Sequence, residues 1–144
     1  DIEPAQTSFD YLSDFMSRFP ESEYAPHARK RMVYLRNVIA RSEIGIANFY
    51  MERGAYVASI GRAKYVLEHL PNTPQTPYAL AILVKAYETL GYVDLSLENK
   101  KILELNYPDF ISDYNLYNNK RSWMNRLSFG VLDKEEVPPP SRLE

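Results

Sequence analysis

Apolar residues recur along the chain at alternating steps of four and three, the spacing that places side chains on one face of an α-helix. Stripes of this kind predict helices over residues 4–19, 26–52, 56–70, 77–90 and 92–107. Pro or Gly stands beside the ends of these segments, where helices start or stop. The pattern therefore predicts an all-α protein.

A block in the middle of the chain returns at a fixed offset of 37 residues, which marks an internal repeat. The matched pairs are Tyr50 and Tyr87, Gly54 and Gly91, Ser59 and Ser96, and Pro71 and Pro108. An aromatic residue near the end of one helix, a Gly at the turn and a Pro closing the next helix are typical of the tetratricopeptide unit, a pair of helices. Each unit buries its apolar face only against its neighbours. We therefore expect a helical-hairpin solenoid with surfaces open to partners.

The helix predicted over 26–52 is longer than the repeat requires. Pro20 and Pro71 stand 51 residues apart, against 37 residues between Pro71 and Pro108. The difference of 14 residues corresponds to about 21 Å of helix. Its predicted stripe consists of Ala28, Met32, Leu35, Ile39, Ser42, Ile46 and Phe49. We expect a neighbouring repeat or a partner surface to cover this overhang.

Three finer features follow from the same pattern. Gly54 stands where a left-handed residue ends a helix. Thr76 is a natural N-cap for the helix that begins at Pro77. The helix over 92–107 has a less regular stripe, made of Leu95, Ile102 and Leu105.

The two ends of the chain depart from the repeat. The first helix is closed by Pro20 like the second half of a unit, so we expect the chain to start inside a longer array. After Asp109 the spacing predicts a final capping helix, with the stripe Leu116, Trp123 and Leu127. We expect residues 1–130 to form one domain. Residues 131–144, with three consecutive prolines, are predicted to be a disordered tail whose last residues come from an expression vector.

Composition narrows the function classes. The 144 residues carry a net charge of −2 and include no cysteine, which excludes disulfides, thiolate nucleophiles and Cys-based zinc sites. No run reaches the roughly 18 apolar residues of a membrane span. The charge gives no overall attraction to nucleic acid. The basic residues of the long helix are interpreted as its solvated face; they are His27, Arg29, Lys30, Arg31, Arg36 and Arg41.

No motif favours catalysis. His27 and His69 are the two histidines of the chain, and no acidic residue stands at a metal-ligand spacing from either. The five glycines are dispersed rather than gathered in a phosphate-binding loop, and the serines lack a nucleophile-elbow context. We expect no enzyme, no metal and no cofactor. The alternative class, a hydrolase of cell-wall material, would require an acidic pair in a deep polar cleft.

Two stretches carry a family resemblance. The first is Ala28-x-x-Arg31-Met32-Val33-Tyr34-Leu35-Arg36-Asn37-x-x-Ala40-x-x-Glu43, and the second is Phe49-Tyr50-x-x-Arg53-Gly54-Ala55-Tyr56-x-Ala58-x-x-x-Arg62. Together with the overlong helix, they resemble the C-terminal half of the BamD family, also called ComL. That family comprises outer-membrane lipoproteins with about five tetratricopeptide-like repeats, which belong to the complex that folds β-barrel proteins into the outer membrane.

The resemblance implies a non-catalytic scaffold at the periplasmic face of the outer membrane. It implies docking on the last periplasmic POTRA domain of the barrel subunit BamA, with the lipoprotein BamE touching the same end. Unfolded outer-membrane proteins are further candidate partners. Membrane contact would come only through an N-terminal lipid anchor that this sequence lacks. The alternative function is a peptide-binding or co-chaperone-like repeat module, for which Asn48 and Lys85 would line a concave clamp.

The candidate partner-binding residues are Arg62, Arg53 and Tyr56, which flank the turn at Gly54. A guanidinium is the side chain best suited to pair bidentately with a carboxylate across an interface. The alternative interpretation is that Arg53 neutralises the carbonyls at its helix end and that Arg62 is merely solvated. The family resemblance favours an interface role for Arg62.

Overall fold

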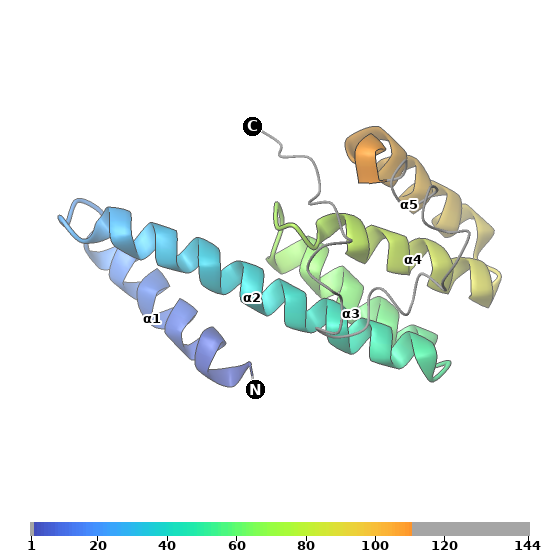
Figure 1. The fold of residues 1–144 in the computed structure, drawn as a ribbon, viewed down its shortest axis with the longest axis horizontal. Helices are drawn as coiled ribbons and strands as arrows, with labels where there is room; N and C mark the ends of the chain where they lie inside the picture. Colours follow the sequence, from blue (N-terminus) through green and yellow to red (C-terminus); the bar gives the residue numbers. More distant parts are fainter. Residues whose placement is uncertain (1, 111–144) are drawn as a thin grey trace.

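The structure is a computed structural model that describes residues 2–110. Its helices are α1 (Glu3–Arg18), α2 (Ala25–Glu52), α3 (Tyr56–His69), α4 (Thr76–Leu90) and α5 (Val93–Asn106). Each helix packs against the next one along the chain, and α2 also contacts α4 (Figure 1). Within this described part no strand is present. The predicted all-α, tetratricopeptide-like hairpin architecture is confirmed.

The overlong helix is confirmed as α2, which has 28 residues where the other helices have 14 to 16. Its first half lies against α1, and its second half lies against α3 and α4 (Figure 1). The overhang is thus covered on one side by the neighbouring helix α1. No residue of α1 is fully buried, so α1 covers the overhang with side chains that are themselves partly exposed.

The main core lies between the second half of α2, α3 and α4. Its buried members are Ile39, Ala40, Ile44, Ala47, Met51, Ala63, Val66, Leu70, Ala79, Ile82, Leu83, Ala86 and Tyr87. The predicted stripe of α2 therefore holds at Ile39 but not at Phe49, which is exposed. A stripe of strict heptad spacing drifts by about 20° per heptad around a straight α-helix. In addition, the second half of α2 contacts two helices, so it buries a broader face than one stripe.

The repeat extends to single side-chain hydrogen bonds. The hydroxyl of Ser59, in α3, donates to the carbonyl of Ala47 in α2 over 2.8 Å. The hydroxyl of Ser96, in α5, donates to the carbonyl of Val84 in α4 over 3.0 Å. Both the donors and the acceptors are related by the same 37-residue offset. Each serine ties the second helix of its hairpin to the first.

The two hairpin turns also match. Gly54 and Gly91 have φ angles of 72° and 80°, in the left-handed region that favours glycine. In both turns the residue after the glycine donates its backbone N–H to the carbonyl of the preceding tyrosine, Tyr50 or Tyr87, over 2.9 Å. The left-handed residue predicted at Gly54 is confirmed.

Three helices end in the same backbone conformation, each directly before a proline. Phe19, Leu70 and Tyr107 have φ angles of −131°, −127° and −136° and ψ angles of 57°, 45° and 55°. The ring of a proline disfavours the helical conformation of the preceding residue, which explains why each helix ends there. The chain therefore leaves α1, α3 and α5 in the same way.

Two finer expectations were wrong. In α5 the predicted stripe of Leu95, Ile102 and Leu105 is exposed, and the helix buries Ser96 and Leu103 instead. The serine hydrogen bond fixes the rotation of α5 on α4, whereas apolar spacing in this leucine-rich helix allowed several stripes. Thr76 is the first residue of α4 rather than its cap, and Gln75 holds the cap position without a side-chain hydrogen bond.

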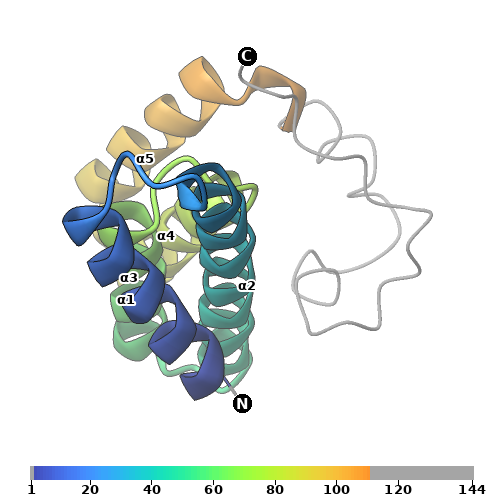
Figure 2. The ribbon, with the colours of Figure 1, turned by 90° about the vertical axis from the view of Figure 1, so that its left-hand side faces the viewer.

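The predicted capping helix, the predicted domain end at residue 130 and the predicted tail over 131–144 lie outside the described residues. Within the described part, α1 and α5 stand at opposite ends of the array (Figure 1). One side of α5 faces α4, and no other described helix lies over its opposite side (Figure 2).

Candidate partner-binding site

Arg62 lies midway along α3 and is held by a carboxylate of α2. Its Nη1 donates to Oε2 of Glu43 over 3.1 Å, which forms an ion pair between the two helices. The side chain of Glu43 is 5% exposed, whereas that of Arg62 is 45% exposed. The carboxylate is therefore inside the α2–α3 interface, and the guanidinium stands at its surface.

This asymmetry determines what the pair can do. A buried carboxylate loses its hydration and must be compensated by hydrogen bonds or an opposite charge. Arg62 provides that compensation with one side of its guanidinium. The remaining N–H donors of a guanidinium form a planar fork that suits a second carboxylate. Arg62 therefore uses part of its guanidinium for the contact with Glu43 and keeps other N–H donors for a partner.

Arg53 is engaged differently. It is the C-terminal cap residue of α2, and its guanidinium lies 4.1 Å from the centroid of the Phe49 ring. A guanidinium over an aromatic face gains a cation–π attraction of about 0.5–1 kcal/mol at an exposed site. Phe49 is itself 44% exposed. Arg53 and Phe49 therefore present a combined cationic and aromatic surface beside the turn.

Tyr56 contributes to the site indirectly, through its packing on the core. It is the first residue of α3 and is partly buried against the main core. Its ring therefore positions the start of α3, and it is less available to a partner than the two arginines.

The structure thus assigns the three predicted residues to different surroundings. Arg62 pairs with Glu43, Arg53 stacks on Phe49, and Tyr56 packs on the core. Sequence reasoning did not identify Glu43 or Phe49 as the partners of the arginines. For Glu43 the detectable signal was a carboxylate among the apolar residues of α2, one turn before the buried Ala47.

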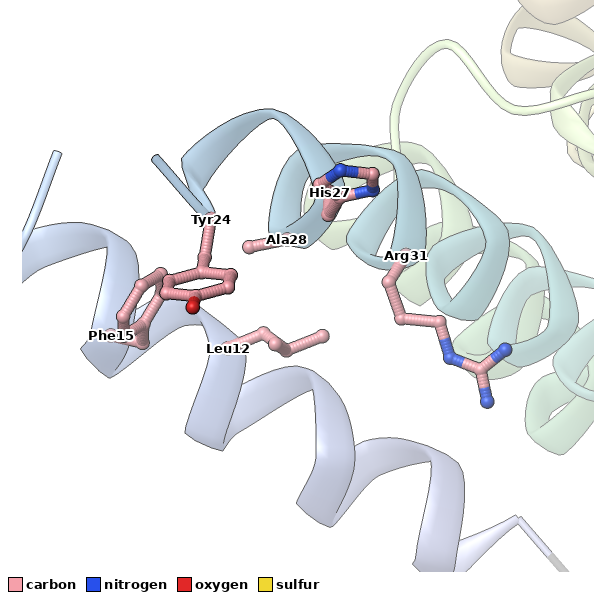
Figure 3. A pocket seen from close by; sticks show the side chains of 6 residues that line it. All are labelled: Leu12, Phe15, Tyr24, His27, Ala28 and Arg31. Atoms are coloured by element: carbon pink, nitrogen blue, oxygen red, sulfur yellow. The ribbon is translucent and has the colours of Figure 1, made fainter. Parts of the chain in front are cut away.

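A groove lies between α1 and the start of α2 (Figure 3). It has a volume of about 350 Å³ and is lined by Leu12, Phe15, Tyr24, His27, Ala28 and Arg31. Leu12 and Phe15 come from α1 and face the side chains of Tyr24 and Ala28 (Figure 3). Its lining is almost entirely apolar, so its chemistry suits an apolar side chain.

The sequence predicts that the basic residues of α2 form a solvated face. His27, Arg29, Lys30, Arg31 and Arg41 are exposed, in agreement with this interpretation. Arg36 differs, because it is half-buried and its Nε atom has no hydrogen-bond partner.

The clamp residues of the alternative peptide-binding function also occupy unlike positions. Asn48 is fully buried inside the fold, whereas Lys85 is exposed and pairs with Glu88. A buried Asn48 cannot line an open concave surface.

Over residues 2–110, no group of three or more His, Cys, Asp or Glu side chains could hold a metal ion. The same range contains no helix with the length and apolar character needed to cross a membrane.

The sequence of the chain matches a known protein family. The profile of the YfiO family, described as an outer membrane lipoprotein, matches residues 1–102. The chain belongs to the YfiO family. This confirms the resemblance drawn from the two motifs around α2 and the turn at Gly54.

Several relatives of this YfiO-family chain carry the name outer membrane protein assembly factor BamD. The protein of Neisseria meningitidis serogroup A is 37% identical over 101 residues, which is 70% of this chain and 38% of the relative. That of Xylella fastidiosa strain Temecula1 is 36% identical over 109 residues, 76% of this chain and 37% of the relative. That of Vibrio cholerae is 33% identical over 106 residues, 74% of this chain and 44% of the relative. The chain therefore spans less than half of the length of these relatives.

Proposed function

We propose that this chain is part of a non-catalytic scaffold for outer-membrane protein assembly, and that it docks on a periplasmic POTRA domain of BamA. The YfiO family match and the names of the relatives support an assembly role. The docking site would be the surface around Arg62 and Arg53. The observation that carries this proposal is the half-exposed guanidinium of Arg62, fixed on the buried carboxylate of Glu43.

The ion pair prepares Arg62 for binding. A free arginine side chain loses conformational entropy when it is immobilised at an interface, at a cost of about 0.5–1.5 kcal/mol. The contact with Glu43 already restrains this side chain before a partner arrives. A carboxylate on the partner could then accept the remaining N–H donors in a bidentate pair. Arg62 would act as a pre-oriented electrostatic contact.

The surface formed by Phe49 and Arg53 would provide a second contact. Aromatic residues and arginine are enriched at the centres of protein interfaces, because they combine large contact area with directed hydrogen bonds. Tyr56 would act indirectly by holding the start of α3 against the core. The fold thus offers two cationic groups, one on α3 and one at the C-terminal end of α2.

The wider setting follows from the same proposal. The scaffold would work at the periplasmic face of the outer membrane, to which a lipid anchor would attach it. BamE and unfolded outer-membrane proteins are further proposed partners. Rigid positioning of the POTRA domain would be the mechanism, so that no catalytic group and no cofactor is required.

Calorimetric titration of this chain with the membrane-proximal POTRA domains of the matching BamA tests the docking proposal. Arg62→Glu should weaken binding by about 2 kcal/mol or more, which is on the order of 30-fold in Kd. Lys64→Glu is the matched control, because Lys64 is an exposed residue of the same helix and the change in charge is identical. We expect this control to leave Kd within about threefold of the wild type, as for a rim charge.

Arg62→Glu places two carboxylates together and could disturb the fold. Arg62→Lys is therefore the second variant, since it keeps the positive charge beside Glu43 but removes the planar fork. Circular dichroism checks the folding of each variant. Wild-type affinity in a folded Arg62→Lys variant and in a folded Arg62→Glu variant would remove Arg62 from the interface. Absence of binding by the folded wild-type chain would refute the docking proposal for this part of the protein.

A further inference from the structure

Arg36 differs from the other basic residues of α2 in its surroundings. It is half-buried, and its Nε atom is enclosed without a hydrogen-bond partner. Within residues 2–110 no acidic side chain forms an ion pair with it. A buried donor without an acceptor is unfavourable, because it loses its bond to water and gains none in return. The stability of the chain alone therefore does not explain the position of Arg36.

Arg36 lies on the face of α2 that is turned toward α3. Arg36, Glu43 and Ala47 follow one another at steps of seven and four, which places them on one side of the helix. Ala47 accepts a hydrogen bond from Ser59 of α3, and Glu43 pairs with Arg62 of α3. Positions on α3 rise as those on α2 fall, because the two helices run in opposite directions. The same face therefore reaches Arg36 near the C-terminal end of α3.

This placement puts two guanidinium groups on one side of the α2–α3 pair. Arg36 stands two helical turns before Glu43, a rise of about 10 Å along α2. Arg62 is fixed on Glu43 over 3.1 Å. In Arg36 the enclosed atom is Nε while the residue as a whole is half-buried, so the Nη end of its guanidinium is the end open to a partner. Two N–H donors side by side suit a carboxylate in a bidentate pair.

We infer that Arg36 is a second partner contact beside Arg62, and that the docking surface of the partner carries two carboxylates on the order of 10 Å apart. The inference rests on the proposed function, because it names a further contact at the same docking surface. One carboxylate would pair with Arg62 and the other with the Nη end of Arg36. The negative charge of the partner would then compensate the enclosed guanidinium of Arg36, which the free chain leaves uncompensated.

A purely structural role for Arg36 predicts a different behaviour. The last carbonyl groups of a helix carry a partial negative charge, so a cation near the C-terminal end of α3 would stabilise that end. Loss of Arg36 would then destabilise the chain. A residue that is kept for a partner behaves in the opposite way, because its replacement by an apolar side chain of similar length removes an unpaired buried donor.

Arg36→Met separates the two roles, since methionine keeps an apolar stem and removes the guanidinium. Calorimetric titration with the membrane-proximal POTRA domains of the matching BamA should give a Kd raised by about tenfold or more, as for an interface arginine. Urea unfolding of the same variant should give a midpoint equal to or above that of the wild type. Arg36→Lys keeps the charge without the planar fork and should also weaken binding.

Arg41→Met is the matched control for the loss of one arginine from α2. Arg41 is exposed on the same helix, five residues further along the chain and about 140° around the helix axis from Arg36. The chemical change is identical, but the side chain lies on another face. We expect Arg41→Met to leave Kd within about threefold of the wild type.

Three results would overturn the inference. A lower urea midpoint for Arg36→Met would assign Arg36 to the fold, whatever its effect on Kd. Wild-type affinity of a folded Arg36→Met variant, together with weakened binding by Arg62→Glu, would remove Arg36 from the interface and leave the proposed docking intact. Absence of binding by the folded wild-type chain would refute the docking proposal itself, and this contact with it.

Discussion

Glu43 and Arg62 share one ion pair, yet removing either partner should have unequal effects. Arg62→Met would leave a buried carboxylate without compensation, which is the costly way to break such a pair. Glu43→Gln would leave a guanidinium that is already half in water and can be hydrated. We expect Arg62→Met to destabilise the chain by about 2 kcal/mol or more, and Glu43→Gln by about 1 kcal/mol or less.

Urea unfolding of the two variants and of the wild type measures this difference. Both variants remove the same contact of 3.1 Å between Arg62 and Glu43. Equal urea midpoints for the two variants would therefore contradict the predicted difference in their stability. Lys64→Met serves as the control for loss of one exposed positive charge on α3, and should shift the free energy of unfolding by less than about 0.5 kcal/mol.

At the scale of residues, the sequence predicts some contacts of the site and not others. Arg62 was chosen from a motif, and the structure places it at a surface with a defined orientation. Its partner Glu43 lies 19 residues earlier, on another helix. Such a pairing depends on how α2 and α3 cross, and apolar spacing contains no information on that. The stacking of Arg53 on Phe49, by contrast, joins residues one helical turn apart and was accessible from sequence.

At the scale of elements, two glycines stand in different backbone conformations and should respond in opposite ways to substitution by alanine. Gly91 has φ of 80° in the α4–α5 turn, whereas Gly61 lies within α3, and an added Cβ would meet no atom within 4 Å at either position. Gly91→Ala should therefore cost about 1 kcal/mol from the left-handed conformation alone. Gly61→Ala should stabilise the chain by about 0.5–1 kcal/mol, because alanine favours the helix.

Thermal and urea unfolding of both alanine variants provide the measurement, with equal space around each new methyl group as the built-in control. Stabilisation by Gly91→Ala would show that the turn is not held in the left-handed conformation. Destabilisation by Gly61→Ala would show that α3 is packed against something at this exposed position.

The positions of the helices could be predicted from the sequence, because proline and glycine mark the helix ends locally. The ends at Phe19, Leu70 and Tyr107 each follow from the next residue being proline. The rotation of α5 was not accessible in this way, since leucines occur on several of its sides. The hydrogen bond from Ser96 to Val84 fixes that rotation, and the match of Ser59 with Ser96 was the clue in the sequence.

At the scale of the whole molecule, α2 connects two parts of the array. Its first half pairs with α1, and its second half builds the core with α3 and α4 (Figure 1). The groove beside Tyr24 and Ala28 belongs to the first part, and the Glu43–Arg62 pair belongs to the second. One continuous helix thus holds two different surfaces at a fixed separation, which is the property that a positioning scaffold needs.

The measurement that tests the proposed docking most directly is a charge-reversal rescue. Arg62→Glu in this chain is combined, one at a time, with Asp→Arg or Glu→Arg variants of the surface of the BamA POTRA domain, and Kd is measured for each pair. We expect one reversed carboxylate to restore at least about tenfold of the lost affinity, because direct charge pairs couple by about 1.5 kcal/mol or more. If every reversal leaves the affinity of the folded Arg62→Glu variant unchanged, Arg62 serves the fold through Glu43 and makes no contact with the partner.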